Sequence, residues 1–440
     1  MRGLLLGILT AVLLVAAGCN SADSQLPAAS EQAVSNYRCT TPGGNHFVYD
    51  LLTGIYYWAD QVPALDPDAY PSQSALLAAG VYSKLDRFSY VTDQASDQAF
   101  YGESQYVGIG ISQKLVASGD LRLTQVFPNS PAALTGLKRG DRILTINGRT
   151  IADLEQSGDL ATAYGPDVVG EPVTLTWTNS VGGTKSAVIN KAVVTIPPVS
   201  LATTFSVGGH TVGYLVFRDF VTPSFDALDQ AFAQFQGQGV DELVLDLRYN
   251  GGGLLSVARH LASLVTGSAD AGKAFATLVY NANYAGLDQT LPLENPPNAL
   301  GLTKVVVITT EATASASELV INGLRPYVKV VKVGSTTFGK PVGFNGFNFC
   351  QKVVYPVTFK MVNADGQSDY YSGFPPDCAA DDDLAHPLGD TAEASLAEAL
   401  NYLGTGKCSN GSMPKPAPRV SKPGGQAVAY GWHTLTGGAH

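Results

Sequence analysis

The chain has 440 residues, of which 45% are hydrophobic and 15% charged, and its formal net charge is −10. This length and composition predict a globular protein of two or three domains with a large core. The acidic balance argues against nucleic acid as a partner, and the composition offers no basic patch for a membrane surface.

The N-terminus, MRGLLLGILTAVLLVAAGCN, has one arginine, an apolar run from Leu4 to Ala17 and then Gly18-Cys19. The run is short for a transmembrane helix and has the shape of a secretory signal. AAGC resembles the lipobox of bacterial lipoproteins, which implies that residues 1–19 are a signal peptide. It also implies that Cys19 carries lipid and that the protein is anchored to a membrane of the cell envelope. An ordinary signal peptide is the alternative, and residues 20–43 are expected to form a flexible tether.

The cysteine count supports export. Once Cys19 is set aside, Cys39, Cys350, Cys378 and Cys408 remain, an even number that suits an oxidising compartment and allows three pairings. We favour Cys350–Cys378, which lie in one C-terminal segment, and Cys39–Cys408, which would tie the chain ends together. No C-x-x-C spacing or Cys/His cluster indicates zinc, and we expect no cofactor.

Residues 44–104 are predicted to form a helical N-terminal domain. HFVYDLLTGIYYWADQ carries apolar residues at helical spacing, and PSQSALLAAGVYSKLDRFSYV is expected to be a second helix that begins near Pro71. We interpret the aromatic residues of the first stretch as core rather than as a ligand site.

Residues 105–197 read as short strands with one short helix, and SPAALTGLKRGDRILTINGRTI resembles part of a PDZ domain. PDZ domains add a peptide C-terminus as a strand and receive its carboxylate on backbone N–H groups. YVGIGI matches the position of the carboxylate-binding loop, which implies peptide binding by Val107, Gly108, Ile109 and Gly110. The two glycines would let the backbone approach the ligand. The alternative is a PDZ fold that serves only as a spacer or gate.

From residue 198 to 405, strands and helices alternate, which predicts a layered α/β core. Strands are expected at 210–220, 241–247, 303–310 and 328–334, with helices at 222–239, 254–265 and 391–403 and after residue 314. Residues 267–300 are interpreted as a long excursion. The Pro- and Gly-rich segment 406–440 is expected to be a disordered tail.

The stretch TTEATASASELVINGLRPY places Ser315 and Ser317 where a buried strand leads into a helix. Free N–H groups and the helix dipole stabilise negative charge there, which suits a nucleophilic hydroxyl, although a simple helix cap would look the same. Two residues are candidates for the base. His260 lies in a core helix, and Lys340 lies in the apolar, glycine-rich run TTFGKPVG. A lysine can act as a base only if burial lowers its pKa.

A glycine loop follows a buried strand in LDLRYNGGG, which contains Asp246, Arg248 and Asn250 before its three glycines. Backbone N–H groups of such a loop can stabilise an oxyanion together with the N–H of Ala316. A tight strand-to-helix turn is the alternative, but it would explain one glycine more easily than three.

In order, a PDZ domain, D-L-R-x-N-G-G-G, T-A-S-A-S-E and F-G-K resemble the tail-specific (C-terminal-processing) serine peptidases over roughly residues 44–405. The resemblance implies a multi-domain α/β protein with a crotonase-like core of the ClpP/crotonase type. It implies Ser315 as nucleophile, Lys340 as base, and the N–H groups of Ala316 and Gly252 as oxyanion donors. Further residues of the glycine loop would support them: Arg248, Asn250 and Gly253. The implied substrates are peptides or unfolded proteins that reach the enzyme through the PDZ domain.

One position departs from that family. Many members have G-K-G-x-x-Q, in which the glutamine orients the lysine, whereas GKPVGF puts Phe344 at that place. The orienting group must therefore come from elsewhere, or packing alone holds Lys340. A peptide-binding PDZ lipoprotein that has lost catalysis and a Ser–His hydrolase that uses His260, as in the tricorn-type core, are the alternatives.

Overall fold

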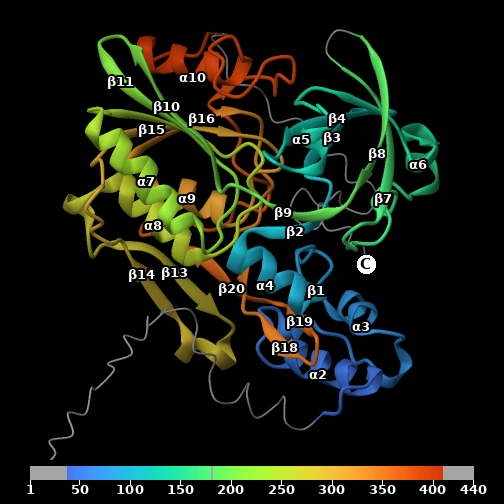
Figure 1. Ribbon diagram of the computed structural model, residues 1–440. Coiled ribbons are helices and arrows are strands. Elements are labelled where there is room, and N and C mark those ends of the chain that lie inside the picture. Colours follow the sequence, from blue (N-terminus) through green and yellow to red (C-terminus); the bar gives the residue numbers. More distant parts are fainter. Residues whose placement is uncertain (1–36, 180–181, 410–440) are drawn as a thin grey trace, which may run out of the picture.

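The computed structural model describes residues 37–179 and 182–409. The expectations for the signal peptide, for lipidation of Cys19 and for most of the tail fall outside these residues. The described chain consists of an N-terminal part, a PDZ domain and an α/β core (Figure 1). None of the described helices combines the length and the apolar character that a membrane span requires.

The core is built on a six-stranded sheet with the order β10-β11-β12-β15-β16-β21. β10 and β11 are antiparallel, and the other neighbours are parallel. The strands of this sheet are β10 (Val199–Val207), β11 (His210–Phe217), β12 (Glu242–Asp246), β15 (Lys304–Thr309), β16 (Lys329–Gly334) and β21 (Cys378–Ala379). The helices that connect or follow them are α7 (Ser224–Gly237), α8 (Leu255–Thr266), α9 (Ala316–Leu324) and α10 (Ala394–Thr405). The layered α/β core expected from the alternating pattern is confirmed.

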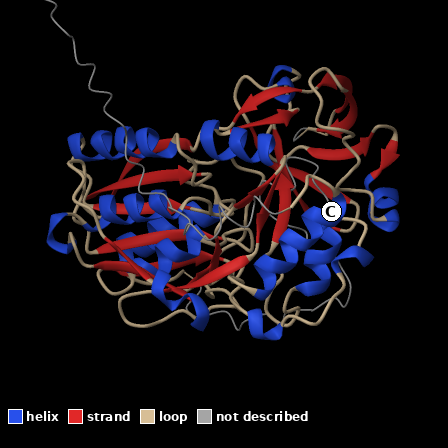
Figure 2. Cartoon of the chain, turned by 90° about the horizontal axis from the view of Figure 1, so that it is seen from below, coloured by secondary structure: helices blue, strands red, loops and turns tan. Residues whose placement is uncertain are grey.

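Alternate residues of each strand face opposite sides of the sheet, and both sides are covered by helices (Figure 2). Leu215 and Phe217 of β11 belong to the same core cluster as the apolar residues of α7, α8 and α9. Tyr214 and Val216 belong to the cluster that Leu403 of α10 joins. Because both faces are buried, the central strands are almost wholly apolar, as parallel sheets require.

A second sheet has the order β14-β13-β20-β17. The excursion at 267–300 contributes a hairpin to it, in which β13 pairs with β14 antiparallel. The elements of this region are the 3₁₀ helices η3 (Ser268–Asp270) and η4 (Ala282–Leu287) and the strands β13 (Ala274–Tyr280), β14 (Gln289–Pro292), β17 (Val342–Phe344) and β20 (Val357–Val362).

The N-terminal part does not form a complete hydrophobic core from its own residues. Its elements are α2 (Thr41–Thr53), η1 (Ala59–Gln61), η2 (Pro67–Ala69), α3 (Gln73–Gly80), β1 (Tyr90–Asp93) and α4 (Gln94–Glu103). β1 pairs with β19 (Lys352–Tyr355), which also pairs with β18 (Phe347–Phe349), so strands from beyond residue 340 complete this unit. The helix expected from Pro71 to beyond residue 85 is too long: it ends at Gly80, and Tyr90–Asp93 is a strand.

The favoured disulfide pairing is wrong. Cys39 bonds Cys350, and Cys378 bonds Cys408. Cys39 precedes α2, and Phe47 of α2 stacks on Phe349 at 5.0 Å between ring centroids, so this packing brings Cys350 to the N-terminus. Cys378 lies in the edge strand β21, which packs beneath α10, and Cys408 follows α10. The bond between Cys378 and Cys408 therefore ties the segment after α10 to the edge of the core sheet.

The PDZ domain is a small, mostly antiparallel β unit (teal to green in Figure 1). β2 pairs with β9, and the order β3-β4-β5-β7-β8 describes the larger sheet, to which β6 attaches through β5. Its elements are β2 (Gln105–Gly108), β3 (Ile111–Ala117), β4 (Asp120–Val126), α5 (Pro131–Leu134), β5 (Arg142–Ile146), β6 (Arg149–Thr150), α6 (Ile151–Ser157), β7 (Pro172–Thr178), β8 (Thr184–Asn190) and β9 (Ala192–Thr195).

Candidate active site

Ser315 occupies a strained turn between the end of β15 and the start of α9. Its backbone has φ 55° and ψ −116°, a conformation that L-residues rarely adopt and that costs about 1–3 kcal/mol. Ser315 is half-buried, whereas Ala314 and Ala316 on either side are buried. The turn therefore presents this one side chain from an otherwise closed segment.

The neighbouring serine is not available for chemistry. Ser317 is fully buried, and its hydroxyl donates a hydrogen bond of 2.9 Å to the carbonyl oxygen of Asn250. The geometry therefore favours Ser315 over Ser317 as the accessible hydroxyl.

The glycine loop packs directly against the serine turn. Gly252 has φ 100°, and a Cβ there would lie 2.8 Å from both Ala316 N and Ser315 Cβ, so only glycine permits this approach. Gly253 has φ 140°, and a Cβ there would lie 2.1 Å from the carbonyl oxygen of Phe220. Two of the three glycines, Gly252 and Gly253, are thus needed by the packing of the loop itself.

Asn250 holds the glycine loop and the serine turn together. Its carbonyl oxygen accepts a hydrogen bond of 3.1 Å from Ala314 N, besides the one from Ser317. Its side-chain Oδ1 accepts the N–H of Gly252 at 2.9 Å, so the predicted second oxyanion donor is already engaged. Within the described chain, the N–H of Ala316 at the start of α9 meets no acceptor and remains available to a developing oxyanion.

Lys340 lies in an apolar enclosure. Its Nζ atom is 3.5 Å from the ring centroid of Phe344 and 5.8 Å from that of Phe88. Burial lowers the pKa of Lys340 to about 7, against the opposing effect of the Asp86 and Glu318 carboxylates. A substantial neutral fraction of this amine is therefore present near pH 7, as a lysine base requires. No hydrogen bond joins Lys340 Nζ to Ser315 Oγ in the described structure, and such bonds are often long without substrate.

Glu318 connects the two candidate catalytic residues and was missed by sequence reasoning. Its Oε2 accepts the backbone N–H of Ser315 at 3.1 Å and that of Lys340 at 2.8 Å. Its Oε1 accepts Gly339 N at 2.6 Å and the Thr337 hydroxyl at 2.5 Å. The sequence did contain a signal, because Ser315-x-x-Glu318 is a capping box, in which the glutamate returns to the N-cap N–H.

Two other candidates lie in structural ion pairs. The wholly buried Arg248 guanidinium binds Asp246 and Glu393 at 2.7–3.0 Å, so it secures the strand end to α10 and does not face Ser315. His260 bonds Asp229 at 2.9 Å and Glu294 at 3.1 Å, which commits both ring nitrogens. Its role as the base of a Ser–His pair does not fit these contacts.

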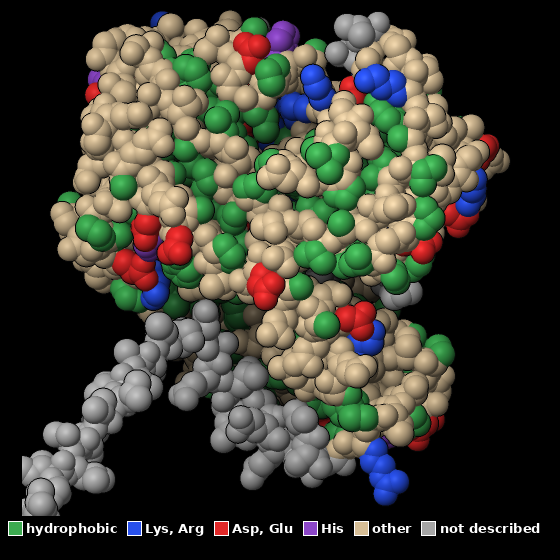
Figure 3. Space-filling model, viewed as in Figure 1, with side chains coloured by type: hydrophobic (Ala, Val, Ile, Leu, Met, Phe, Trp, Pro, Cys, Tyr) green, Lys and Arg blue, Asp and Glu red, His purple; other side chains and the backbone are tan. Residues whose placement is uncertain are grey.

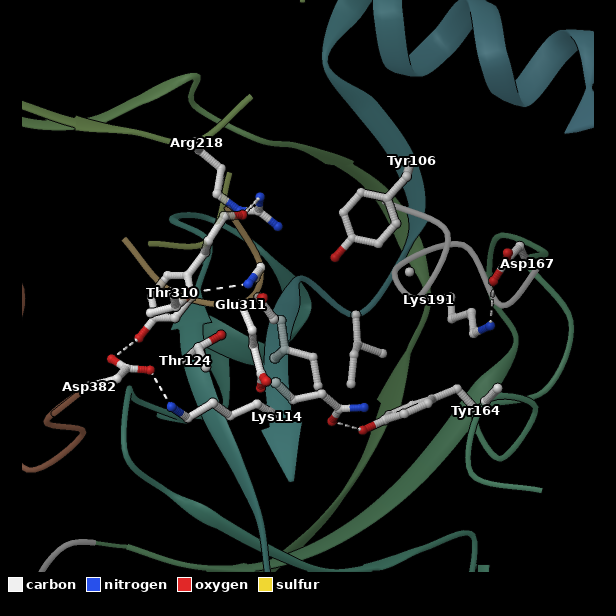
Figure 4. A pocket seen from close by; sticks show the side chains of 18 residues that line it. Tyr106, Lys114, Thr124, Tyr164, Asp167, Lys191, Arg218, Thr310, Glu311 and Asp382 are labelled. Atoms are coloured by element: carbon white, nitrogen blue, oxygen red, sulfur yellow. Dashed lines mark hydrogen bonds and ion pairs between the residues drawn. The ribbon is translucent and has the colours of Figure 1, made fainter. Parts of the chain in front are cut away.

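A pocket lies between the PDZ domain and the core, where Lys and Arg side chains gather around a hollow (Figure 3). Gly108 and Ile109 line it, together with Glu311 and Ala312 from the segment before Ser315. The Tyr106 hydroxyl points into the pocket (Figure 4), and a Cβ at Gly108 would lie 2.4 Å from the Tyr106 ring. The space above this part of the expected carboxylate loop is thus filled by a side chain of the domain itself.

The other two residues of that loop are placed as follows. Val107 is half-buried in β2. Gly110 has φ 90°, and the position that a Cβ would take at this residue faces Ser130. A Cβ at Gly110 would lie 2.0 Å from Ser130 Cβ. The internal packing of the domain therefore accounts for this glycine without a ligand.

Three segments of the chain match models of known protein families. Residues 211–380 match the model of peptidase family S41, and residues 44–90 match that of the peptidase S41 N-terminal domain. Two parts of the chain, the α/β core and the N-terminal part, thus match models of peptidase family S41. A PDZ domain model matches residues 122–163, inside the β unit that packs on the S41 core.

Curated relatives of the chain include processing proteases. A carboxyl-terminal-processing protease of Picosynechococcus sp. is 29% identical over 238 residues, which cover 53% of this chain and 54% of the relative. The carboxy-terminal processing protease CtpB of Bacillus subtilis is 28% identical over 278 residues, covering 59% and 53%. The chain therefore spans about half the length of the curated relatives it matches.

Two solved structures share the fold over more of the chain. One is a Bacteroides fragilis protein described as an S41 protease, which is 28% identical and gives a TM-score of 0.66. The match covers 82% of this chain and 97% of that one. The photosystem II D1 C-terminal processing protease is 20% identical, with a TM-score of 0.51 and coverage of 83% and 97%. At that identity the second likeness supports the fold alone.

Proposed function

We propose that this chain is a serine endopeptidase of the C-terminal-processing type and that it works through a Ser315–Lys340 dyad. One observation carries the proposal: the Lys340 amine is desolvated, with a pKa of about 7, and the backbone N–H groups of Lys340 and of the half-buried Ser315 donate to the same buried carboxylate. A base with a pKa near the working pH is suited to general acid–base catalysis.

In the proposed reaction, Ser315 Oγ attacks the scissile carbonyl carbon while its proton passes to Lys340 Nζ. The oxyanion is stabilised by the N–H of Ala316, whose position at the N-terminus of α9 adds the helix dipole. The Lys340 ammonium then gives its proton to the leaving amine as the C–N bond breaks. Water, deprotonated by Lys340, releases the acyl group, and the proton returns to Ser315.

The second oxyanion donor is a point on which we revise the expectation. Gly252 N–H bonds Asn250 Oδ1, so Gly252 can serve only if that bond opens when substrate binds. Gly253, the next residue of the loop, is the alternative donor.

We propose that the substrates are peptides or unfolded proteins delivered by the PDZ domain. The pocket between this domain and the core runs from Gly108 and Ile109 to the segment that precedes Ser315, which suits a chain terminus. Tyr106 would have to move for a carboxylate to reach Gly108.

We place the activity outside the cytoplasm. Two disulfides support this location, because such bonds persist in oxidising compartments. Attachment to a membrane through lipidated Cys19 remains the proposal that the sequence supports.

A second candidate function is a PDZ peptide-binding lipoprotein with weak or no catalysis, favoured by the lack of a hydrogen bond between Ser315 and Lys340. The test compares cleavage of an unfolded protein by the parent and by Ser315→Ala, Lys340→Ala and His260→Ala. The dyad predicts loss in the first two and activity in the third. Undiminished cleavage by Lys340→Ala would rule it out, and binding of C-terminal peptides without cleavage by any form would favour the binding protein.

A further inference from the structure

The Lys340 side chain has an aromatic partner where the resemblance expects a glutamine. Phe344 ends β17, four residues after Lys340, and its ring centroid lies 3.5 Å from Nζ. An amine above the face of a ring is stabilised most when it is protonated, because the π face carries a partial negative charge. The ring therefore offers Lys340 an oriented contact without any hydrogen bond.

The Phe344 ring is itself held in a fixed orientation. It packs edge-on against Tyr90 at 5.5 Å and against Tyr355 at 6.0 Å between centroids. Tyr90 and Tyr355 stack on each other at 4.9 Å, and the Tyr355 hydroxyl donates to Asp97 Oδ2 at 2.9 Å. Because β1 and α4 supply two of these groups, the N-terminal part helps to fix the ring that contacts Lys340.

The charged groups around Lys340 are engaged elsewhere. Asp86 accepts hydrogen bonds from the Tyr56 hydroxyl, from Ser89 and from backbone N–H groups. Glu318 is occupied by backbone N–H groups and by Thr337, and Arg87 donates to the carbonyl oxygen of Phe338 at 2.8 Å. Across the described residues, no hydrogen bond involves Lys340 Nζ, so the Phe344 ring is its nearest defined contact.

Resting on the proposed function, we propose that Phe344 is the positioning residue of Lys340. The ring face fixes the neutral amine as a base and stabilises the ammonium that forms when the Ser315 proton moves from Oγ to Nζ. That proton leaves again to the amine of the departing peptide, so the ring takes part in no bond change. Phe344 thus orients Lys340 through a π contact, in place of the polar side chain that the sequence lacks at this position.

The test uses Phe344→Leu, which keeps an apolar side chain and removes the π face, and Phe344→Tyr, which keeps the face. Phe347→Leu is the matched control, because Phe347 is a buried aromatic of the next strand, and the rings found near Lys340 Nζ among the described residues are those of Phe88 and Phe344. We expect Phe344→Leu to shift the acid limb of the kcat/KM–pH profile to lower pH by about half to one unit, because the ammonium loses its contact with the ring. The plateau value of kcat/KM should also fall. Phe344→Tyr and Phe347→Leu should keep the parental acid limb.

A second readout does not depend on catalysis. The pKa of Lys340 is followed by NMR with carbon-labelled lysine, and Lys340→Met identifies the signal. A folded Phe344→Leu protein with the parental Lys340 pKa and acid limb, or an equal shift in Phe347→Leu, would overturn the proposal. Full cleavage by Ser315→Ala would instead overturn the proposed function, so the two failures are distinguishable.

Discussion

The backbone N–H of Lys340 donates a hydrogen bond of 2.8 Å to Glu318 Oε2, across 22 residues of sequence. The same oxygen accepts the N–H of Ser315, so one carboxylate sets the spacing of the two backbone segments that carry the proposed dyad. Burial raises the pKa of Glu318, and its hydrogen bonds oppose that shift. The Glu318 carboxylate is therefore a buried group whose loss should disturb the segments of Ser315 and Lys340 together.

We expect Glu318→Gln to impair both stability and turnover. The amide keeps the shape of the side chain but turns an N–H₂ group toward backbone donors, and each lost bond to a buried charge costs about 2 kcal/mol. Displacement of the dyad should lower kcat by about tenfold or more while KM changes little. Denaturant unfolding and peptide hydrolysis measure the two effects.

The control for this variant is Glu103→Gln, because Glu103 is exposed at the end of α4. It should behave as the parent in both assays. A Glu318→Gln protein with parental kcat would contradict the positioning role of this carboxylate.

We expect Lys340→Met to be inactive but more stable than the parent. Burial lowers the pKa of Lys340 from 10.5 to about 7, so between these values the unfolded chain binds more protons than the folded one. Stability of the parent therefore rises with pH over this window. The gain from methionine should be about 1–3 kcal/mol at pH 7 and should shrink toward pH 10.5. Urea unfolding at several pH values measures it, and a destabilised methionine variant would argue against a buried, costly amine.

Asp382 joins the PDZ domain to the core. It binds Lys114 and Arg139 of the PDZ domain and the Tyr249 hydroxyl of the core, and Arg248 lies 3.5 Å away. Although burial opposes the shift, Lys114 and the two arginines lower the pKa of Asp382 to about 2. Its contribution is complete above pH 3.8 and is lost as pH falls toward 2.

Asp382→Asn should therefore lower the unfolding free energy by about 2 kcal/mol at pH 7 and loosen the PDZ domain. Hydrogen exchange of β3 and β4 reports the loosening. Asp120→Asn is the matched control, because this aspartate is more exposed than Asp382 in its pairs with Arg122 and Arg142, and its substitution should cost at most about 1 kcal/mol. Equal protection of β3 and β4 in the parent and in Asp382→Asn would show that the domain is held by other contacts.

His260→Gln should retain peptide hydrolysis and lose stability. Although burial lowers the pKa of His260, Glu294 and Asp229 outweigh it, so the pKa is raised above 6.5. The stabilisation is complete below pH 6.5 and is lost as pH rises through the folded pKa. Thermal unfolding should show a gap between parent and variant at pH 6 that narrows by pH 9. Loss of hydrolysis in a folded His260→Gln protein would revive the Ser–His alternative.

The alternation of strands and helices after residue 198 was readable in the sequence because apolar periodicity is local. The serine turn, the glycine loop and the buried lysine run could be located in the same way. The hairpin at β13 and β14 and the role of Tyr90–Asp93 as a strand were harder to predict. Strand pairing depends on partners far along the chain, and β1 finds its partner in β19.

The sequence by itself determined the order of the three parts and the residue types at the candidate site, because periodicity, capping and glycine content act over a few residues. Only the tertiary structure decided which cysteines meet, that Glu318 bridges Ser315 and Lys340, and that the Phe344 ring lies over the lysine amine. The disulfides and the bond between Glu318 and Lys340 join residues 22 to 311 positions apart, and the Phe344 ring, although only four residues from Lys340, is oriented by Tyr90 and Tyr355. These contacts depend on how the elements pack, and local sequence patterns do not record that packing.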